Sequence, residues 1–297
     1  MSAGRVPDPT QVKALLAATL RRATRGSMVS GRRGKPRGLI FLLSMYGVMG
    51  FLLGLVAFVH PDVFTFSLVV WSATFMMAGM TLVAESSTLL FDPRDNDVLG
   101  HRPIHPRTLL MARSVALVAL ALLLGLALNL VPMFTGLAAN GARPWFPAVH
   151  LLTLLLMTVF TAGAVVFVYG LLARFVSRRT FDTIASWTQV AISAVLIASY
   201  QMVPRLMDRL QGFHIDVAHP LLLILPPTWF AALAMVLMGV DTGTRALVMS
   251  AAAVISTAGL AWSANRYLAE GYARQMAALA ETPARAEPDN VEAPAMK

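Results

Sequence analysis

The 297-residue chain contains no cysteine and few charged residues. The lack of cysteine excludes disulfides, thiolate metal sites and cysteine nucleophiles. Charged residues make up 13% of the chain, whereas soluble proteins carry roughly 25%. Apolar residues make up 57%. This balance excludes an ordinary soluble domain and indicates an integral membrane protein.

Seven stretches have no Asp, Glu, Lys or Arg and reach the length of about 20 residues that a bilayer crossing requires. Together they leave no room for a sizeable soluble domain, and the chain shows no internal repeat. We therefore predict an all-α integral membrane protein. The seven stretches are Leu39–Val59, Val63–Ala84, Val115–Phe134, Trp145–Ala173, Thr183–Pro204, Leu221–Val240 and Ala246–Asn265.

Residues 1–38 form a basic leader. It holds nine of the basic residues, only Asp8 opposes them, and no aromatic residues are interleaved. This pattern predicts a cytoplasmic leader that contacts anionic lipid, not nucleic acid. Apolar residues at helical spacing after Asp8-Pro9 predict an amphipathic helix in the membrane interface. They are Val12, Leu15, Leu16 and Leu20.

With the leader inside, alternation places both termini in the cytoplasm if six segments in 39–266 cross. Leu221–Val240 is the exception, because Pro226-Pro227 near its centre removes two backbone donors and breaks a helix. A seventh crossing would also move four basic residues of the C-terminal end outside. We predict instead a re-entrant helical hairpin over about 219–240 on the outer side, with seven spans as the alternative. Residues 267–297 read as a partly disordered cytoplasmic tail.

The loop after the second span, within 86–108, carries the signals of a short charged helix. Asp92 suits the N-cap, Pro93 the first helical position, and Asp95 the third, where a carboxylate complements the helix dipole. Gly100 can end the helix in the left-handed conformation, and Pro103 prevents it from restarting. The pattern predicts a stiff helix of about two turns at the cytoplasmic face.

Two kinds of metal site could be imagined in this loop, and the sequence favours neither. Asp92, Asp95 and Asp97 are similar to the acidic motif after the second span of intramembrane prenyltransferases, but no second acidic cluster follows. His101 and His105 have zinc-like spacing, and Pro103 between them prevents a shared helix face. We expect no metal, no cofactor and no enzymatic activity.

Few ionisable residues lie inside the predicted spans. Glu85 and Arg113, near the matching ends of the second and third spans, are predicted to form an ion pair. His150 is expected at the outer interface. Methionines such as Met45, Met49, Met76, Met77 and Met80 are expected to fill helix contacts. Gly47, Gly50 and Gly54 are expected to allow close helix packing.

On these features the chain resembles the membrane (permease) subunit of an ABC transporter of the type-2 exporter class. The likeness covers the basic leader, six spans, the Leu90–Ile104 loop and the Pro-rich, Trp-containing segment Leu225–Ala231. Arg102 departs from the family's usual hydrophobic residue before the proline. His105 replaces the usual small hydroxyl residue, a better N-cap, before the third span.

The resemblance implies a multi-pass protein of the inner (plasma) membrane that couples to a separate ABC ATPase subunit and pairs with a second permease half, as homo- or heterodimer. Pro226, Pro227 and Trp229 would form an outer re-entrant gate. The alternatives are a secondary carrier, a structural subunit of a membrane complex or, less favoured, a prenyltransferase-like enzyme. The implied partner-coupling residues are Phe91, Asp92, Pro93, Arg94, Asp95, Asp97, Val98 and Leu99.

Overall fold

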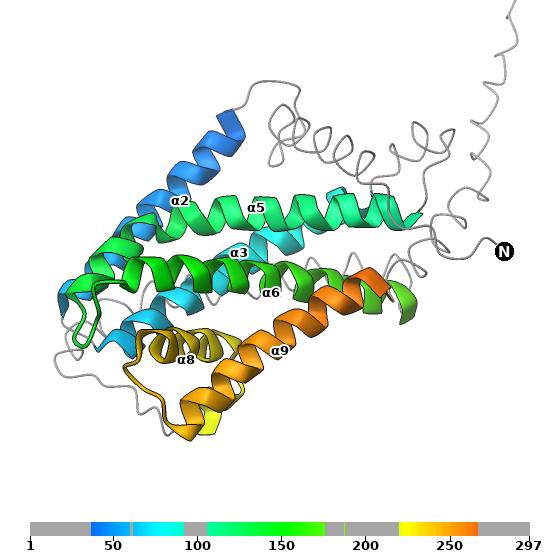
Figure 1. The fold of residues 1–297 in the computed structure, drawn as a ribbon. Coiled ribbons are helices and arrows are strands. Elements are labelled where there is room, and N and C mark those ends of the chain that lie inside the picture. Colours follow the sequence, from blue (N-terminus) through cyan, green and yellow to red (C-terminus); the bar gives the residue numbers. More distant parts are fainter. Residues whose placement is uncertain (1–36, 60–61, 92–105, 176–186, 188–219, 267–297) are drawn as a thin grey trace, which may run out of the picture.

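A computed structural model describes residues 37–59, 62–91, 106–175, 187 and 220–266. Within these ranges the chain is helical and forms no strand, which confirms the all-α prediction (Figure 1). The long helices are α2 (Arg37–Leu55), α3 (Val63–Phe91), α5 (Pro106–Thr135), α6 (Phe146–Phe175) and α9 (Thr244–Arg266). The shorter ones are α8 (Pro226–Met238) and three 3-10 turns, η1 (Val56–Val59), η2 (Gly136–Ala138) and η3 (Pro220–Leu223).

Five of the described helices are long and apolar enough to cross a membrane, and they match five of the seven predicted stretches. The segment Leu221–Val240 does not form such a helix, since α8 has 13 residues and is about 20 Å long. Apart from Trp187, the predicted span Thr183–Pro204 lies outside the described residues, as do the leader helix and the C-terminal tail.

The start of α3, the α5–α6 turn and the α8–α9 turn meet at one end of the bundle, which we call the tight-turn end. The backbone of Asp62, just before α3, forms an isolated β-bridge with Asn140 in the α5–α6 turn. The Val63 amide donates to the Asn140 carbonyl at 3.0 Å. A Cβ at Gly141 (φ +83°) would lie within 4.0 Å of both Val63 and Val240, which places the α8–α9 turn here as well.

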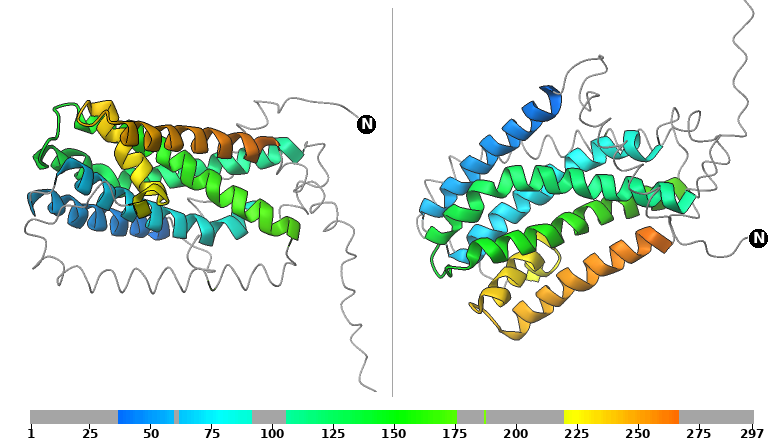
Figure 2. Two further views of the ribbon diagram at one scale, coloured as in Figure 1. Left: turned by 90° about the horizontal axis from the view of Figure 1, so that it is seen from below. Right: turned by 45° about the horizontal axis from the view of Figure 1, so that its top comes forward.

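Helix α2 lies at the edge of the bundle and packs mainly on α5. Its Arg37 end diverges from α5 (Figure 1 and the right-hand view of Figure 2). The contact is closest at Gly50 and Gly54, where an added Cβ would lie 2.1 Å from the Leu128 carbonyl oxygen and 2.7 Å from Val131 Cγ1. The prediction of close packing is therefore confirmed at these two glycines. The same prediction is wrong for Gly47, because no atom lies within 4 Å of its Cβ position.

The interior contains two apolar clusters. One joins α3, α6, α8 and α9 and includes Trp71, Phe66, Phe146 and Phe230, all fully buried. The other joins α2, α3, α5 and α6 around Tyr46, Leu82, Leu117 and Leu124. Met77 fills this second cluster as predicted, whereas Met45 is exposed.

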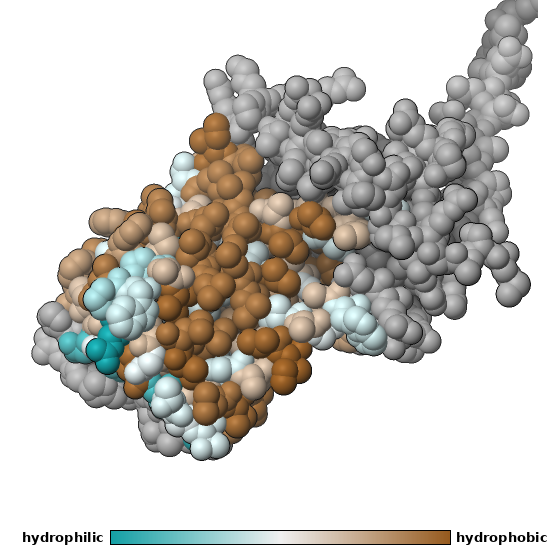
Figure 3. Space-filling view, viewed as in Figure 1, coloured by the Kyte–Doolittle hydropathy of each residue, from teal (hydrophilic) through white to brown (hydrophobic). Residues whose placement is uncertain are grey.

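The described surface is largely apolar, as expected of helices that face lipid (Figure 3). Phe41 and Ile255 are 71% and 70% exposed on α2 and α9. Trp145 is exposed just before α6 at the tight-turn end, and Trp262 near the far end of α9. Tryptophan favours both membrane–water interfaces, so these two residues fit the borders of a membrane-embedded bundle.

A polar contact fixes α2 against α3. The Tyr46 hydroxyl donates to the Met77 carbonyl at 2.7 Å and lies 2.6 Å from Thr81 Oγ1. We expect Tyr46→Phe to lower the free energy of unfolding by about 1 kcal/mol, measured in detergent by denaturant titration. The control is Ser256→Ala, because the Ser256 hydroxyl donates only to carbonyls of its own helix. Equal stability of Tyr46→Phe and the wild type would contradict the role of this hydroxyl.

Candidate functional site

The predicted coupling helix lies outside the described residues, so the structure does not test it. Helix α3 ends at Phe91 and α5 begins at Pro106, which leaves residues 92–105 between them. Of the predicted coupling residues, only Phe91 belongs to a described helix. The rest are Asp92, Pro93, Arg94, Asp95, Asp97, Val98 and Leu99.

The two helices that flank this loop extend past their apolar segments. In α3 the apolar stretch of the sequence ends at Ala84, seven residues before Phe91, and in α5 it begins at Val115, nine residues after Pro106. These extensions add about 10 Å and about 13 Å of helix. They lie at the end of the bundle opposite the tight turns. The loop is therefore connected to the bundle by two continuous helices.

The predicted ion pair between Glu85 and Arg113 is only partly described. Arg113 is 3% exposed near the start of α5. Glu85 belongs to the α3 extension, but its side chain is outside the described part of the structure. The pair stays a prediction.

The predicted gate residues lie at the start of α8. Pro226 and Pro227 occupy the first two helical positions, where missing amide donors cost nothing, and Leu225 is the N-cap. Breaking of the segment by the prolines is confirmed, but they begin a helix and do not interrupt one. Gly239 ends α8 in the left-handed conformation (φ 68°).

Side chains of the first turn of α8 hold the preceding residues. Thr228 Oγ1 is 2.5 Å from the Leu225 carbonyl and also contacts the Leu222 carbonyl, and Trp229 Nε1 donates to the Leu223 carbonyl at 2.8 Å. The Leu225 carbonyl also accepts from the Thr228 amide at 3.1 Å, whereas Leu222 and Leu223 lie before α8 and are held by the side chains of its first turn. These bonds give the η3–α8 connection a defined shape.

Helix α8 begins part-way along the bundle and runs to the tight-turn end. Its first turn contacts Phe160 of α6, with ring centroids 6.2 Å from Trp229 and 5.4 Å from Phe230. Phe160 lies fourteen residues into α6, about 21 Å from the Phe146 end. Helix α8 therefore covers only part of the length of the bundle.

Sequence reasoning missed a buried polar cluster formed by Thr74 of α3, Asn129 of α5 and His150 of α6. Asn129 Nδ2 donates to Thr74 Oγ1 and to the Gly125 carbonyl, both at 2.9 Å. His150 Nε2 lies 3.0 Å from Asn129 Oδ1. His150 is 1% exposed, so its side chain faces the interior of the bundle. Its ring stacks on Trp71 with centroids 4.3 Å apart.

The hydrogen bonds define the chemical form of this cluster. The Thr74 hydroxyl donates to the Val70 carbonyl at 2.8 Å, so its oxygen accepts from Asn129. Both hydrogens of Asn129 Nδ2 are used, and its Oδ1 can only accept. His150 Nε2 must therefore carry a proton. One amide group thus joins three helices with a directional set of bonds.

A signal for this cluster was present in the sequence. Asn129 is an amide within an apolar stretch of α5, and such a group in a membrane helix requires a partner on another helix. The partner could not be identified from sequence, because His150 lies 21 residues away in a different helix and Thr74 lies 55 residues away.

The described residues contain no group of three or more His, Asp or Glu that could hold a metal ion. No family model, curated protein or solved structure matches this chain. The five apolar helices define the class of protein as a multi-pass α-helical membrane protein.

Proposed function

We propose that this chain is the membrane subunit of an ATP-driven transporter, of the type-2 ABC exporter kind. The observation that carries the proposal is the pair of helical extensions that flank 92–105. Because α3 and α5 continue without interruption past their apolar segments, a force on the loop is transmitted to both helices.

In this proposal the tight-turn end faces outward and both termini are cytoplasmic. An ABC ATPase subunit binds the 92–99 helix, with Phe91, Val98 and Leu99 as apolar contacts. Asp92, Arg94, Asp95 and Asp97 provide charge pairing. ATP hydrolysis resides in the partner, and a second permease half completes the pathway.

The half-crossing helix α8 supports the same proposal. Its proline-rich start lies part-way along the bundle, at the depth of Phe160, and Leu223, Ile224 and Leu225 before it are exposed in the single chain. Irregular backbone at such a depth is tolerated only if protein or a polar cavity surrounds it, which a second permease half would supply. Pro226, Pro227 and Trp229 then shape an outer gate. Six of the eight residues after Trp229 are buried. Because α8 is packed against the other helices in this way, any movement of α8 changes its contacts with the bundle.

The decisive experiment is co-purification of the chain with tagged candidate ATPases. We expect a stable complex that Asp95→Lys or Leu99→Asp reduces at least tenfold, because each change places an unfavourable group in the interface. Thr242→Lys, at the exposed tight-turn end, is the matched control and should leave the complex intact. Because the chain contains no cysteine, a single introduced cysteine is the only residue that a thiol reagent labels. We expect Asp95→Cys to react with an impermeant reagent from the cytoplasmic side and Thr242→Cys from the outside.

Transport in liposomes driven by an ion gradient alone would replace this proposal with a secondary carrier. Labelling of Asp95→Cys only from the outside would refute the coupling role. Magnesium-dependent turnover by the isolated chain would indicate an enzyme.

A further inference from the structure

Two buried hydrogen-bond donors on α3 have no partner among the described residues. They are the Ser67 hydroxyl and the Trp71 indole Nε1, and both side chains are 0% exposed. Burying such a group without a hydrogen bond costs about 1–3 kcal/mol. Two of them, one helical turn apart, need an explanation.

Ser67 differs from the other buried hydroxyl groups of the spans. Six of these donate to the carbonyl four residues earlier in their own helix, which satisfies them without any other partner. Ser67 does not bond the Val63 carbonyl in this way. Its hydroxyl is therefore available to another molecule. The six self-satisfied residues are Thr74, Thr153, Thr158, Thr161, Ser250 and Thr257.

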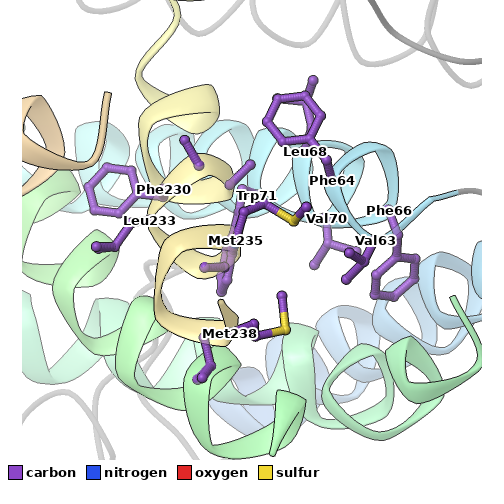
Figure 4. Packing of buried hydrophobic residues seen from close by; sticks show 14 of the residues in the cluster. Val63, Phe64, Phe66, Leu68, Val70, Trp71, Phe230, Leu233, Met235 and Met238 are labelled. Carbon is purple, nitrogen blue, oxygen red and sulfur yellow. The ribbon is translucent and has the colours of Figure 1, made fainter. Parts of the chain in front are cut away.

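The two donors lie on one face of α3. Residues four apart in a helix share a face, and a long side chain covers the turn that precedes its own Cα. The Trp71 indole thus lies over the turn that holds Ser67. By contrast, Trp229 satisfies its Nε1 with the Leu223 carbonyl. Figure 4 shows Trp71 among the side chains that α3 and α8 contribute to the apolar core.

The surroundings select a neutral partner. Helix α8 contains no ionisable residue. In the described part of α5, Arg113 lies sixteen residues before Asn129, or about 24 Å along the helix. Asp62, five residues before Ser67 in the chain, accepts from Thr65 at the start of α3 and would repel an anion. A cation would require acceptors, and Ser67 and Trp71 offer hydrogens.

We propose that Ser67 and Trp71 form a binding site for a neutral acceptor oxygen in the α3–α6–α8 core. One oxygen with two lone pairs can accept from both groups, and the Trp71 ring beside it stacks on His150, which contacts Phe146. The oxygen belongs either to a water molecule or to the hydroxyl or carbonyl of an apolar solute in the membrane. Ser67 is the fifth residue of α3, about 6 Å from the tight-turn end.

The test uses the full chain in nanodiscs with ¹⁵N-labelled tryptophan. The five indole signals are assigned with Trp71→Phe and equivalent single changes. We expect the Trp71 N–H proton at a downfield, hydrogen-bonded position, and Ser67→Ala should move it upfield. Ser250→Ala is the matched control, because the Ser250 hydroxyl bonds the Ala246 carbonyl, and it should leave the signal unchanged.

Two arms distinguish the sources of the oxygen. A cross-peak between the Trp71 indole proton and water protons identifies water. A shift on addition of 1-octanol or methyl octanoate, but not octane, identifies a solute. A Trp71 signal that is not hydrogen-bonded under any of these conditions, or that Ser67→Ala does not change, would overturn the proposal.

The melting temperature of Ser67→Ala is an independent measurement, because the two explanations of the buried hydroxyl predict different changes in it. If Ser67 binds an oxygen, Ser67→Ala removes a hydrogen bond and lowers the melting temperature relative to Ser250→Ala. If the hydroxyl is simply buried without a partner, its removal leaves the melting temperature unchanged or raises it, which contradicts the site. Neither result depends on an ATPase partner, so the proposed transport function is tested separately.

Discussion

Gly50→Ala is expected to separate α2 from the bundle or to unfold the protein at ordinary temperature. The added Cβ would lie 2.1 Å from the carbonyl oxygen of Leu128, and 2.8 Å from its carbonyl carbon. Both atoms belong to the backbone of α5, so no rotamer change can relieve the clash. Overpacking in a core costs about 1–3 kcal/mol, and a backbone clash belongs at or above the upper end of this range.

A graded glycine series provides the controls. Gly54→Ala should cost less than Gly50→Ala, since its closest contact is the side-chain atom Val131 Cγ1, which can move. Gly47→Ala should be neutral or stabilising by up to about 1 kcal/mol, because its Cβ meets nothing within 4 Å and alanine is the better helix former.

The measurement is the denaturation midpoint of the three variants in one detergent, with monodispersity by size exclusion. Comparable midpoints for Gly47→Ala and Gly50→Ala would show that α2 does not pack on α5 in this way. If Gly54→Ala had a lower midpoint than Gly50→Ala, the closest contact between α2 and α5 would be at Gly54, which contradicts the prediction.

The helices themselves were predictable, because crossing a bilayer imposes a minimum length of apolar sequence. Five stretches became long helices whose bounds lie within four residues of the expected ones, except at the end of α3 and the start of α5, which extend seven and nine residues further. The exception, Leu221–Val240, was identified from Pro226 and Pro227, since proline lacks the amide that a helix interior requires. What sequence did not show is that the prolines begin the helix and that residues 220–223 form a separate turn.

Contacts between helices were much less predictable. The glycine spacing indicated a close approach of α2, but the three glycines look equivalent in sequence, and only the crossing point on α5 separates Gly50 from Gly47. The burial of His150 was not predictable, because distance from the end of a span does not reveal whether a side chain faces lipid, solvent or another helix. Asn129 faces the interior at 1% exposure, and this orientation draws His150 inward.

Asn129→Leu is expected to lower the free energy of unfolding by about 2 kcal/mol. The change leaves the His150 Nε2 hydrogen buried without its acceptor and removes the bond to Thr74. A buried donor without a partner costs about 1–3 kcal/mol. Measured hydrogen bonds between membrane helices average about 0.6 kcal/mol and reach about 1.7, so most of the expected loss comes from the orphaned imidazole.

A double-mutant cycle separates the bond from the other effects of the substitution. His150→Phe keeps an aromatic ring to stack on Trp71 and removes the hydrogen that Asn129 accepts. In that background Asn129→Leu should cost about 1 kcal/mol less than in the wild type, because no donor is left unsatisfied. Thr158→Val is the control for a buried polar group that bonds only its own helix, and its effect should stay below about 0.5 kcal/mol.

The readout is reversible unfolding of the four proteins of the cycle in mixed micelles. Additive losses would mean that Asn129 and His150 do not interact, and the directional link between α5 and α6 would then be wrong. A coupling of the expected size would show that one amide selects the neighbours of α5. Apolar packing alone cannot do this, because an apolar side chain gains little free energy when it moves from contact with lipid to contact with another helix.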